Sequence, residues 1–387
     1  GSDLTINSGS GSLSISAIAG TSDEDVSIDA GTGSISVGTI GDGTGINDIS
    51  LSASGGVTLK GNITTSDNGT DDASLAITGG VTLGGDVAID MSDGGGVDLT
   101  IAGVVDDDGS DRALSFNLGT GNLVFNNNVG SSQPLGSLTI TEAANVTFDQ
   151  SLTVDGAISQ TTGSGTTTFT GVTSGGSFSI KNSTKIDVAN TLTANSGGAI
   201  SLHSDSIDFA NSVTGTGTIT LADFDNDLTI AVDGGGGAGS LEITNTELGH
   251  LQDGFSEIII GDGTTSTITL GAGGYSFSDS LHLKAGGTSG NISLNASPTL
   301  GSGNNLTVTV GSSAALPLNQ NLQTDGGSIT VNGAVQVDGS ISMDSENGGG
   351  TAGAIAITGT VDAEGTGTDS LTIDASGTTG ANVTLSG

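Results

Sequence analysis

The sequence predicts an all-β fold, a right-handed parallel β-helix (β-solenoid) with degenerate coils of about 22–26 residues. Two observations support it. Short triplets with two aliphatic residues around one small residue recur along the chain, and Gly, Asn or Asp stands in most gaps between them. Such alternation with period two is typical of half-buried strands, and Gly and Asn favour the corners that separate them.

The spacing of these triplets favours short strands joined by sharp corners. The triplets that begin at Leu75, Val81 and Val87 follow one another too closely for ordinary hairpins with conventional loops. Other triplets begin at Leu99 and Leu123, which follow Leu75 at equal intervals in the sequence. This interval is our candidate for one coil of the solenoid.

The composition limits the core and the partners. The chain has 387 residues, 69 Gly, nine Phe, no Trp and no Cys, which suits a narrow aliphatic core without disulfides. Its formal net charge of −37 disfavours nucleic acid and anionic membranes as partners, because phosphate binding needs clustered Lys and Arg. The acidity suits a saline or cation-rich exterior, where repulsion is screened.

We expect residues 1–387 to form one continuous β-solenoid, an internal segment of a longer chain, because the triplet pattern runs throughout without a shift in composition. Neither a signal peptide nor an apolar run long enough to span a membrane is recognised. The competing architecture is a string of immunoglobulin-like sandwiches. The dense triplets and the small number of prolines, three in all, disfavour it.

Residues 241–261 form an atypical insertion or coil. We expect a brief helix or turn from Thr246 to Gln252, capped by Asn245 or Thr246 and ending before Gly254, with a strand after it. This stretch contains the patterns T-x-x-E-L-x-x-L and G-F-x-x-I-x-I-G. It resembles a sequence pattern found in very large bacterial β-strand-repeat surface exoproteins related to filamentous haemagglutinins. The resemblance implies an exported right-handed parallel β-helix that serves adhesion, cell contact or a surface layer.

Acidic clusters are the candidate metal sites, since carboxylate oxygens are the ligands that Ca²⁺ prefers. The candidate Ca²⁺ ligands are Asp106, Asp108, Asp111, Asp223, Asp225 and Asp227. The second group has the i, i+2, i+4 spacing that begins an EF-hand loop, but Leu228 and Gly234 stand where that loop has Gly and Glu. No tandem G-G-x-G-x-D repeats of the RTX type occur. Solvated loops are the competing interpretation, and no cofactor is expected to be required.

Catalysis is not expected. A β-helix enzyme acting on polysaccharide would need paired acids supported by Lys or Arg, and the sequence has five Lys and Arg in all. His203, His250 and His282 fit no short metal-ligand spacing and are interpreted as surface residues. The row Thr166-Thr167-Thr168-Phe169-Thr170 raises the alternative of an ice- or crystal-binding hydroxyl face, which irregular coils disfavour.

These observations predict a structural rod, filament or surface-layer component of a bacterial extracellular protein. The alternative is an adhesin that binds glycans or cells. An adhesin should show a concave or aromatic-bearing patch, which we expect near Tyr275 and Phe277, whereas a spacer should be uniformly polar. We expect self-association, end to end or laterally, or association with other cell-surface components.

Overall fold

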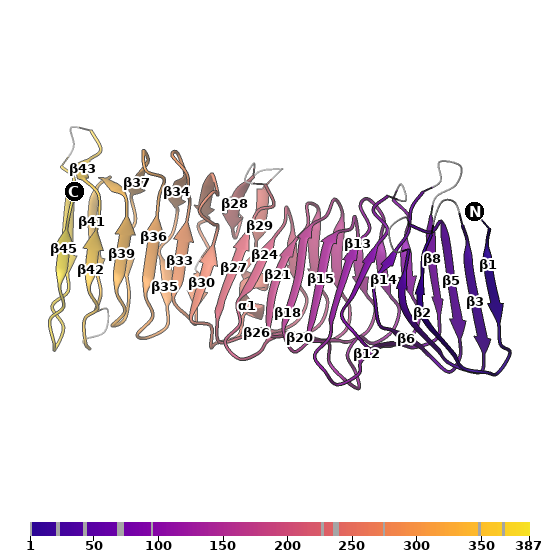
Figure 1. Cartoon of the computed structure of the whole chain (residues 1–387). Coiled ribbons are helices and arrows are strands. Elements are labelled where there is room, and N and C mark those ends of the chain that lie inside the picture. The colour runs from indigo at the N-terminus through magenta and orange to yellow at the C-terminus, as the bar shows by residue number, and fades with distance from the viewer. Residues whose placement is uncertain are drawn as a thin grey trace. The chain divides into compact units, whose positions relative to one another are not determined.

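The computed structural model describes residues 2–20, 24–41, 45–67, 73–93, 96–225, 228–234, 240–273, 275–346, 350–365 and 368–387. The fold is an all-β parallel β-solenoid of about 15 turns of about 23 residues, with almost no helix. The chain divides into two compact units, Gly1–Asn195 and Ser196–Gly387. In each of them, strands that follow one another by one coil lie side by side (Figure 1).

The strands of the first unit are β1 (Leu4–Asn7), β2 (Leu13–Ile18), β3 (Val26–Gly31), β4 (Ile35–Ile40), β5 (Asp48–Ala53), β6 (Val57–Leu59), β7 (Ile63–Thr64), β8 (Ser74–Thr78), β9 (Val81–Leu83), β10 (Val87–Asp90), β11 (Leu99–Ile101), β12 (Val105–Asp107), β13 (Ala113–Asn117), β14 (Leu123–Phe125), β15 (Ser137–Glu142), β16 (Val146–Phe148), β17 (Leu152–Thr153), β18 (Ala157–Thr162), β19 (Thr166–Phe169), β20 (Thr173–Gly175), β21 (Ser177–Lys181), β22 (Lys185–Val188) and β23 (Leu192–Ala194).

The elements of the second unit are β24 (Ile200–His203), β25 (Ile207–Phe209), β26 (Val213–Thr214), β27 (Thr218–Ala222), β28 (Thr229–Val232), β29 (Ser240–Ile243), α1 (Asn245–His250), β30 (Glu257–Ile260), β31 (Thr267–Leu270), β32 (Tyr275–Phe277), β33 (Leu281–Lys284), β34 (Asn291–Leu294), β35 (Pro298–Leu300), β36 (Leu306–Thr309), β37 (Ala315–Leu318), β38 (Leu322–Gln323), β39 (Ile329–Asn332), β40 (Ala334–Val337), β41 (Ser340–Asp344), β42 (Ile355–Ile357), β43 (Val361–Ala363), β44 (Ser370–Asp374) and β45 (Val383–Leu385).

The coil repeat predicted from the triplets is confirmed by the strand register. Ile77 of β8 pairs with Ile101 of β11, and Leu99 of β11 pairs with Leu123 of β14, so the evenly spaced triplets stack directly on one another. The three closely spaced triplets are β8, β9 and β10, and each pairs with its own strand one coil later: β11, β12 and β13. All of these pairings are parallel, as a solenoid requires and an antiparallel sandwich does not allow.

Coil length varies more than predicted. In the column that starts with β1, the step from Ile49 to its partner Leu75 is longer than the average turn, whereas the step from Thr167 to its partner Ile186 is shorter. The strands pair in register in both coils, so the difference lies in the connecting corners. Differences in coil length are therefore accommodated by the corner loops and not by the core strands, as expected of loops on a repeat scaffold.

Residues 241–261 belong to a coil with an added strand and helix. Ile219 of β27 pairs with Ile258 of β30, so this coil is much longer than the average turn. Strand β28 pairs on one side with β29, which follows it in sequence, and on the other with β31. The predicted short helix is present as α1, which packs against β25. Among the described residues, no helix is long and apolar enough to cross a membrane.

The cap of α1 lies earlier in the chain than we expected. Thr244 is the N-cap, and its side chain accepts hydrogen bonds from the amides of Thr246 and Glu247. The Glu247 carboxylate in turn accepts the Thr244 amide at 2.8 Å. This capping box satisfies amide groups that the first turn would otherwise leave without partners. Leu248 is the buried residue of the helix.

Side chains at the coil corners hold successive coils of the first unit together. The position before the first inward residue of the β1 column is polar in every coil of this unit. Asp98 Oδ1 accepts the amide of Asn122 at 2.9 Å, and Asn122 Oδ1 accepts that of Asn145 at 3.2 Å. Asn145 Oδ1 then accepts the amide of Thr166 at 2.7 Å. We call this row the amide ladder. These side chains accept hydrogen bonds from backbone amides at the ends of the strands, beyond the backbone hydrogen bonds that join neighbouring strands.

Candidate functional site

The first predicted acidic cluster is used by the fold. Asp106 points outward from β12, and its Oδ1 accepts the amides of Ser132 at 2.9 Å and Gln133 at 3.4 Å. Asp108 receives two hydrogen bonds from the Arg112 guanidinium, at 3.2 and 3.1 Å. The hydrogen bonds from Arg112 hold the pKa of Asp108 below its usual value. Asp111 is exposed and has a φ of 54°.

The buried carboxylate of this cluster is Asp107, which belongs to the same acidic run but was not among the predicted Ca²⁺ ligands. It takes an inward position at the end of β12 and is 3% exposed. Its Oδ2 accepts the amides of Ser110 and Arg112, each at 3.1 Å. Asp107 thus stabilises the corner loop in which the neighbouring acidic residues lie. The available signal was its place two positions after Val105 in a strand triplet, which makes it an inward residue.

The residues of the second predicted acidic cluster differ in how deeply they are buried. Asp223 is fully buried after β27, and its Oδ2 accepts the amide of Leu228 at 3.4 Å. Asp225 is exposed, and Asp227 lies outside the described residues. Among the residues that the structure describes, no three His, Cys, Asp or Glu side chains gather in a way that could hold a metal ion. Ca²⁺ binding by these six residues stays a prediction.

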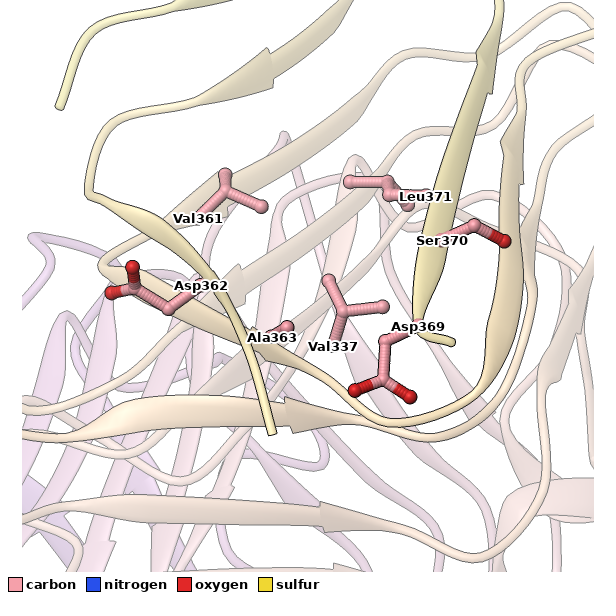
Figure 2. A pocket seen from close by; sticks show the side chains of 7 residues that line it. All are labelled: Val337, Val361, Asp362, Ala363, Asp369, Ser370 and Leu371. Atoms are coloured by element: carbon pink, nitrogen blue, oxygen red, sulfur yellow. The ribbon is translucent and has the colours of Figure 1, made fainter. Parts of the chain in front are cut away.

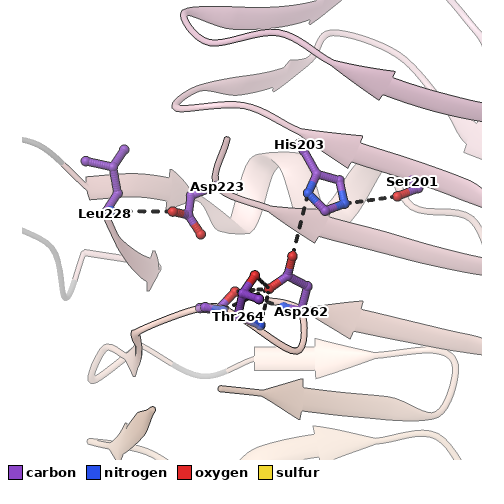
Figure 3. Close-up of polar contacts among 7 residues, drawn as sticks. Ser201, His203, Asp223, Leu228, Asp262 and Thr264 are labelled. Atoms are coloured by element: carbon purple, nitrogen blue, oxygen red, sulfur yellow. Dashed lines mark hydrogen bonds and ion pairs between the residues drawn. The ribbon is translucent and has the colours of Figure 1, made fainter. Parts of the chain in front are cut away.

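Near Asp223, three polar side chains of the second unit form the arrangement that most resembles a catalytic constellation (Figure 3). Ser201 and His203 both point outward from β24, and His203 Nε2 lies 3.1 Å from Ser201 Oγ. His203 Nδ1 lies 3.8 Å from Asp262 Oδ2, at the corner after β30. The sequence predicted a surface position for His203; the structure makes it half-buried, among these partners.

Asp262 is fixed by its own corner. Its Oδ1 accepts the amides of Thr264 at 2.7 Å and Thr265 at 2.8 Å, and the Thr264 hydroxyl at 2.7 Å. Burial alone would raise the pKa of Asp262, but these hydrogen bonds and nearby His203 outweigh it, so the pKa lies below its usual value. The carboxylate is therefore ionised near neutral pH, and its Oδ2 faces the imidazole.

The arrangement lacks two requirements of nucleophilic catalysis. The contact of 3.8 Å between His203 and Asp262 is longer than a hydrogen bond, so the imidazole is not oriented as in a Ser-His-Asp triad. Ser201 lies within β24, which pairs in register with β27. Amides within a strand point in the plane of the sheet toward neighbouring strands, whereas an oxyanion would form above its face. The geometry supports a surface polar network more than acyl transfer.

A second histidine contact has a different electrostatic character. His282 Nδ1 lies 3.9 Å from Glu257 Oε1, and its Nε2 lies 2.9 Å from Thr309 Oγ1. Burial, with a smaller contribution from Lys284, lowers the pKa of His282 to about 4. Burial also raises the pKa of Glu257. His282 is therefore neutral near pH 7, and its contact with Glu257 is not an ion pair there.

The aromatic patch expected for an adhesin is not formed by Phe277. This side chain is 3% exposed, and it pairs in register with buried Leu300 of β35. Phe277 takes an inward position of β32, so its side chain does not contribute to such a patch. The side chain of Tyr275, the other expected member of the patch, lies outside the part of the chain that the structure describes.

No protein-family model, no curated protein and no solved structure matches this chain.

Proposed function

We propose that this chain is a non-catalytic structural module of a bacterial extracellular or surface protein, whose stacked coils act as a spacer or a filament body. The observation that carries this proposal is that its polar side chains hydrogen-bond to the backbone of the same or the next coil. The amide ladder from Asp98 to Thr166 and the corner carboxylate Asp107 connect coils or close corners, as described above. Groups engaged in this way support the scaffold.

The net charge of −37 supports an exterior location, because a strongly acidic surface keeps an exported module soluble in a saline medium. The resemblance of residues 241–261 to haemagglutinin-related exoproteins supports the bacterial surface. An adhesin that binds glycans is the competing function, and because Phe277 is buried it does not form part of the aromatic-bearing patch that an adhesin should show. End-to-end or lateral self-association, or contact with other surface components, fits a spacer, and weak Ca²⁺ binding by acidic corners is compatible with it.

A first experiment separates a spacer from an adhesin or a polysaccharide-acting enzyme. The purified chain is applied to a glycan array and incubated with a panel of acidic and neutral polysaccharides. A spacer gives neither specific binding nor release of reducing ends. Saturable binding to one glycan class, or cleavage of one polysaccharide, would contradict the proposal.

A second experiment tests whether one coil is dispensable, as the scaffold role requires. Deleting residues 99–122 removes β11, β12 and β13, one strand from each pairing column, and joins Asp98 to Leu123. Asp98 can then accept the amide of Asn145 as Asn122 does, so we expect a folded, shorter chain with an unchanged circular dichroism spectrum per residue. The control deletes residues 99–110, about half a coil, and should unfold the region because strand registers no longer match.

A further inference from the structure

Two strand columns of the second unit are interrupted at the same boundary between coils. Strands β33, β34 and β35 form one coil, and β36, β37 and β38 form the next. Strand β33 pairs in parallel with β36. Strands β34 and β37 lie side by side but end one sheet and begin another, and β35 and β38 do the same. Among the described residues, strand pairing therefore crosses this boundary through β33 and β36 alone.

The interruption between β34 and β37 has a cause in the sequence. In a parallel pair, each residue directs its amide and its carbonyl to the same neighbouring strand, and successive residues alternate between the two neighbours. The Leu318 carbonyl accepts the Asp338 amide at 3.1 Å, just after β40, so Leu318 is directed to β40 and Pro317 to β34. Proline has no amide hydrogen to donate, so β37 lacks a donor at this position.

The opposite edge, on β34, also lacks a free donor. The Asn291 amide donates to the Ser266 carbonyl on the β31 side at 3.0 Å, so the amide of the next residue, Ile292, is directed to β37. This amide donates to Asn291 Oδ1 at 2.9 Å. A side chain of β34 itself thus takes the hydrogen bond that a neighbouring strand would accept.

The surface is hollowed at both interruptions. A hollow of about 360 Å³ at β34 and β37 is lined by residues that include Asn291 and Pro317, with Gln336 of β40. A smaller hollow of about 80 Å³ is lined by residues 297–300, at β35, and 323–325, at β38. The strands at this boundary thus have space beside them in which to move.

A hollow alone does not mark an interruption. Figure 2 shows another, of about 160 Å³, with Val337, Val361 and Leu371 of β40, β43 and β44 around it. There Val337 pairs with Ala363, and Leu371 pairs with Ile341 of β41, so the strand pairing continues. The boundary between β34 and β37 differs because a hollow and two mismatched strand edges coincide.

We propose that this boundary is a conformational joint, at which β34 separates from β37 and β35 from β38 while β33 and β36 stay paired. The coils bend at the joint without unfolding. Corner contacts limit the opening: the Gly311 amide donates to the Gly290 carbonyl at 2.7 Å. In the closed state, Ile292 and Leu316 are 0% exposed. The joint goes beyond the proposed spacer role, because it is independent of what the module binds.

Amide hydrogen exchange of the full chain tests the joint. The Leu294 amide, like that of Ile292, is directed to β37. Its partner Leu270, one coil earlier, directs its amide to β34 within a paired column. In the same coil as Leu294, Leu283 pairs with Val308 of β36. We expect the Leu294 amide to exchange at least about tenfold faster than those of Leu270 and Leu283. Equally slow exchange at all three would overturn the proposal, and so would equally fast exchange, because the whole boundary would then open.

A repaired joint gives the sharper result. Pro317→Thr supplies the missing amide and places a strand-forming residue at an outward position, so exchange at Leu294 should slow at least about fivefold. Adding Asn291→Ala releases the Ile292 amide and should slow it further. The matched control is Gln336→Thr, which pairs with Pro317 from β40 and should leave the rate unchanged.

Unchanged exchange at Leu294 in the variant that carries both Pro317→Thr and Asn291→Ala would overturn the assigned cause. Circular dichroism of each variant confirms that the chain is folded when exchange is measured. None of these outcomes bears on the spacer role, which the glycan screen and the coil deletion test separately.

Discussion

Two buried clusters in the same coils of the first unit fill the solenoid interior in opposite ways. Phe125, Phe148 and Phe169 stack along the β1 column, with ring centroids 5.0 and 5.4 Å apart and nearly parallel planes. Thr167, two positions before Phe169 on β19, also points inward and is 1% exposed. Its hydroxyl donates to Gln160 Oε1 at 2.5 Å and accepts from Asn182 Nδ2 at 3.0 Å.

The difference lies in the direction of the contacts. The aromatic column joins one coil to the next, and any aliphatic or aromatic residue above or below it would make a usable contact. The polar cluster joins different strands across the interior, because Gln160 lies on β18 and Asn182 follows β21. A buried polar group must find its partners at fixed positions, whereas apolar groups need only area and volume. The two clusters should therefore respond differently to truncation and to conservative change.

The largest effect is expected from Phe148→Ala, at the centre of the aromatic column. Phe148 is 1% exposed and lies between two stacked rings, so truncation leaves a cavity that a rigid stack closes poorly. We expect the free energy of unfolding to fall by about 3–5 kcal/mol, measured by urea denaturation. The conservative control Phe148→Leu should cost less than half as much. Equal losses for both variants would show that the ring stacking, rather than the buried volume, is what matters.

A smaller effect, about 1–3 kcal/mol, is expected from Asn182→Ala in the polar cluster. The Asn182 side-chain amide accepts from the Gly165 backbone amide at 2.9 Å and donates to the Ala144 carbonyl at 3.2 Å and to buried Thr167 Oγ1 at 3.0 Å. Truncation removes all three hydrogen bonds, although the Gly165 amide and the Ala144 carbonyl still bond to each other. Here the conservative control is Asn182→Asp, which keeps the acceptor but cannot donate. In contrast to Phe148→Leu, it should be no better tolerated than alanine at neutral pH. A well-tolerated aspartate would contradict the role given to the two donated hydrogen bonds.

The comparison also shows which parts of the fold the sequence could predict. Alternating aliphatic triplets predicted the strands, and the equal intervals from Leu75 to Leu99 and Leu123 predicted the coil, because stacking by translation requires the same period in sequence and in space. Thr167 was not recognised as an inward residue. In a row of four threonines and one phenylalanine, alternation alone cannot separate the two faces, and the row was considered as a hydroxyl surface.

The candidate sites were less predictable for a related reason. The density of carboxylates in the sequence indicated Asp106 and Asp108 as candidate metal ligands. A carboxylate can also stabilise a corner by accepting hydrogen bonds, and its partners include backbone amides, which the amino-acid composition does not reveal. The pair Ser201 and His203 could be found from their i, i+2 spacing on one strand. Asp262 could not, because the enlarged coil between β27 and β30 brings it back to the same face from a distant part of the sequence.

A finer test of the polar cluster is Thr167→Val, which keeps the shape of the side chain and removes its hydroxyl. Gln160 and Asn182 each lose one partner, but Asn182 keeps its bonds to Gly165 and Ala144. We expect a loss of about 1 kcal/mol in the free energy of unfolding. In the double variant with Asn182→Ala, the losses should not add, because both variants break the same hydrogen bond. Strict additivity in this cycle would contradict the network.

The smallest effect is expected at the amide ladder, where water can replace a lost partner. Asn122→Ala removes the acceptor of the Asn145 amide at an exposed position, and we expect a loss of about 0.5–1 kcal/mol. Asn122→Asp should recover most of this loss, because Asp98 performs the same role one coil earlier with a carboxylate oxygen. Amide hydrogen exchange at Asn145 gives the local measurement: faster exchange in the alanine variant and near-normal exchange in the aspartate variant. If the alanine variant exchanges at the unaltered rate, the ladder does not hold the coils together, and the polar residues at these corners serve solubility alone.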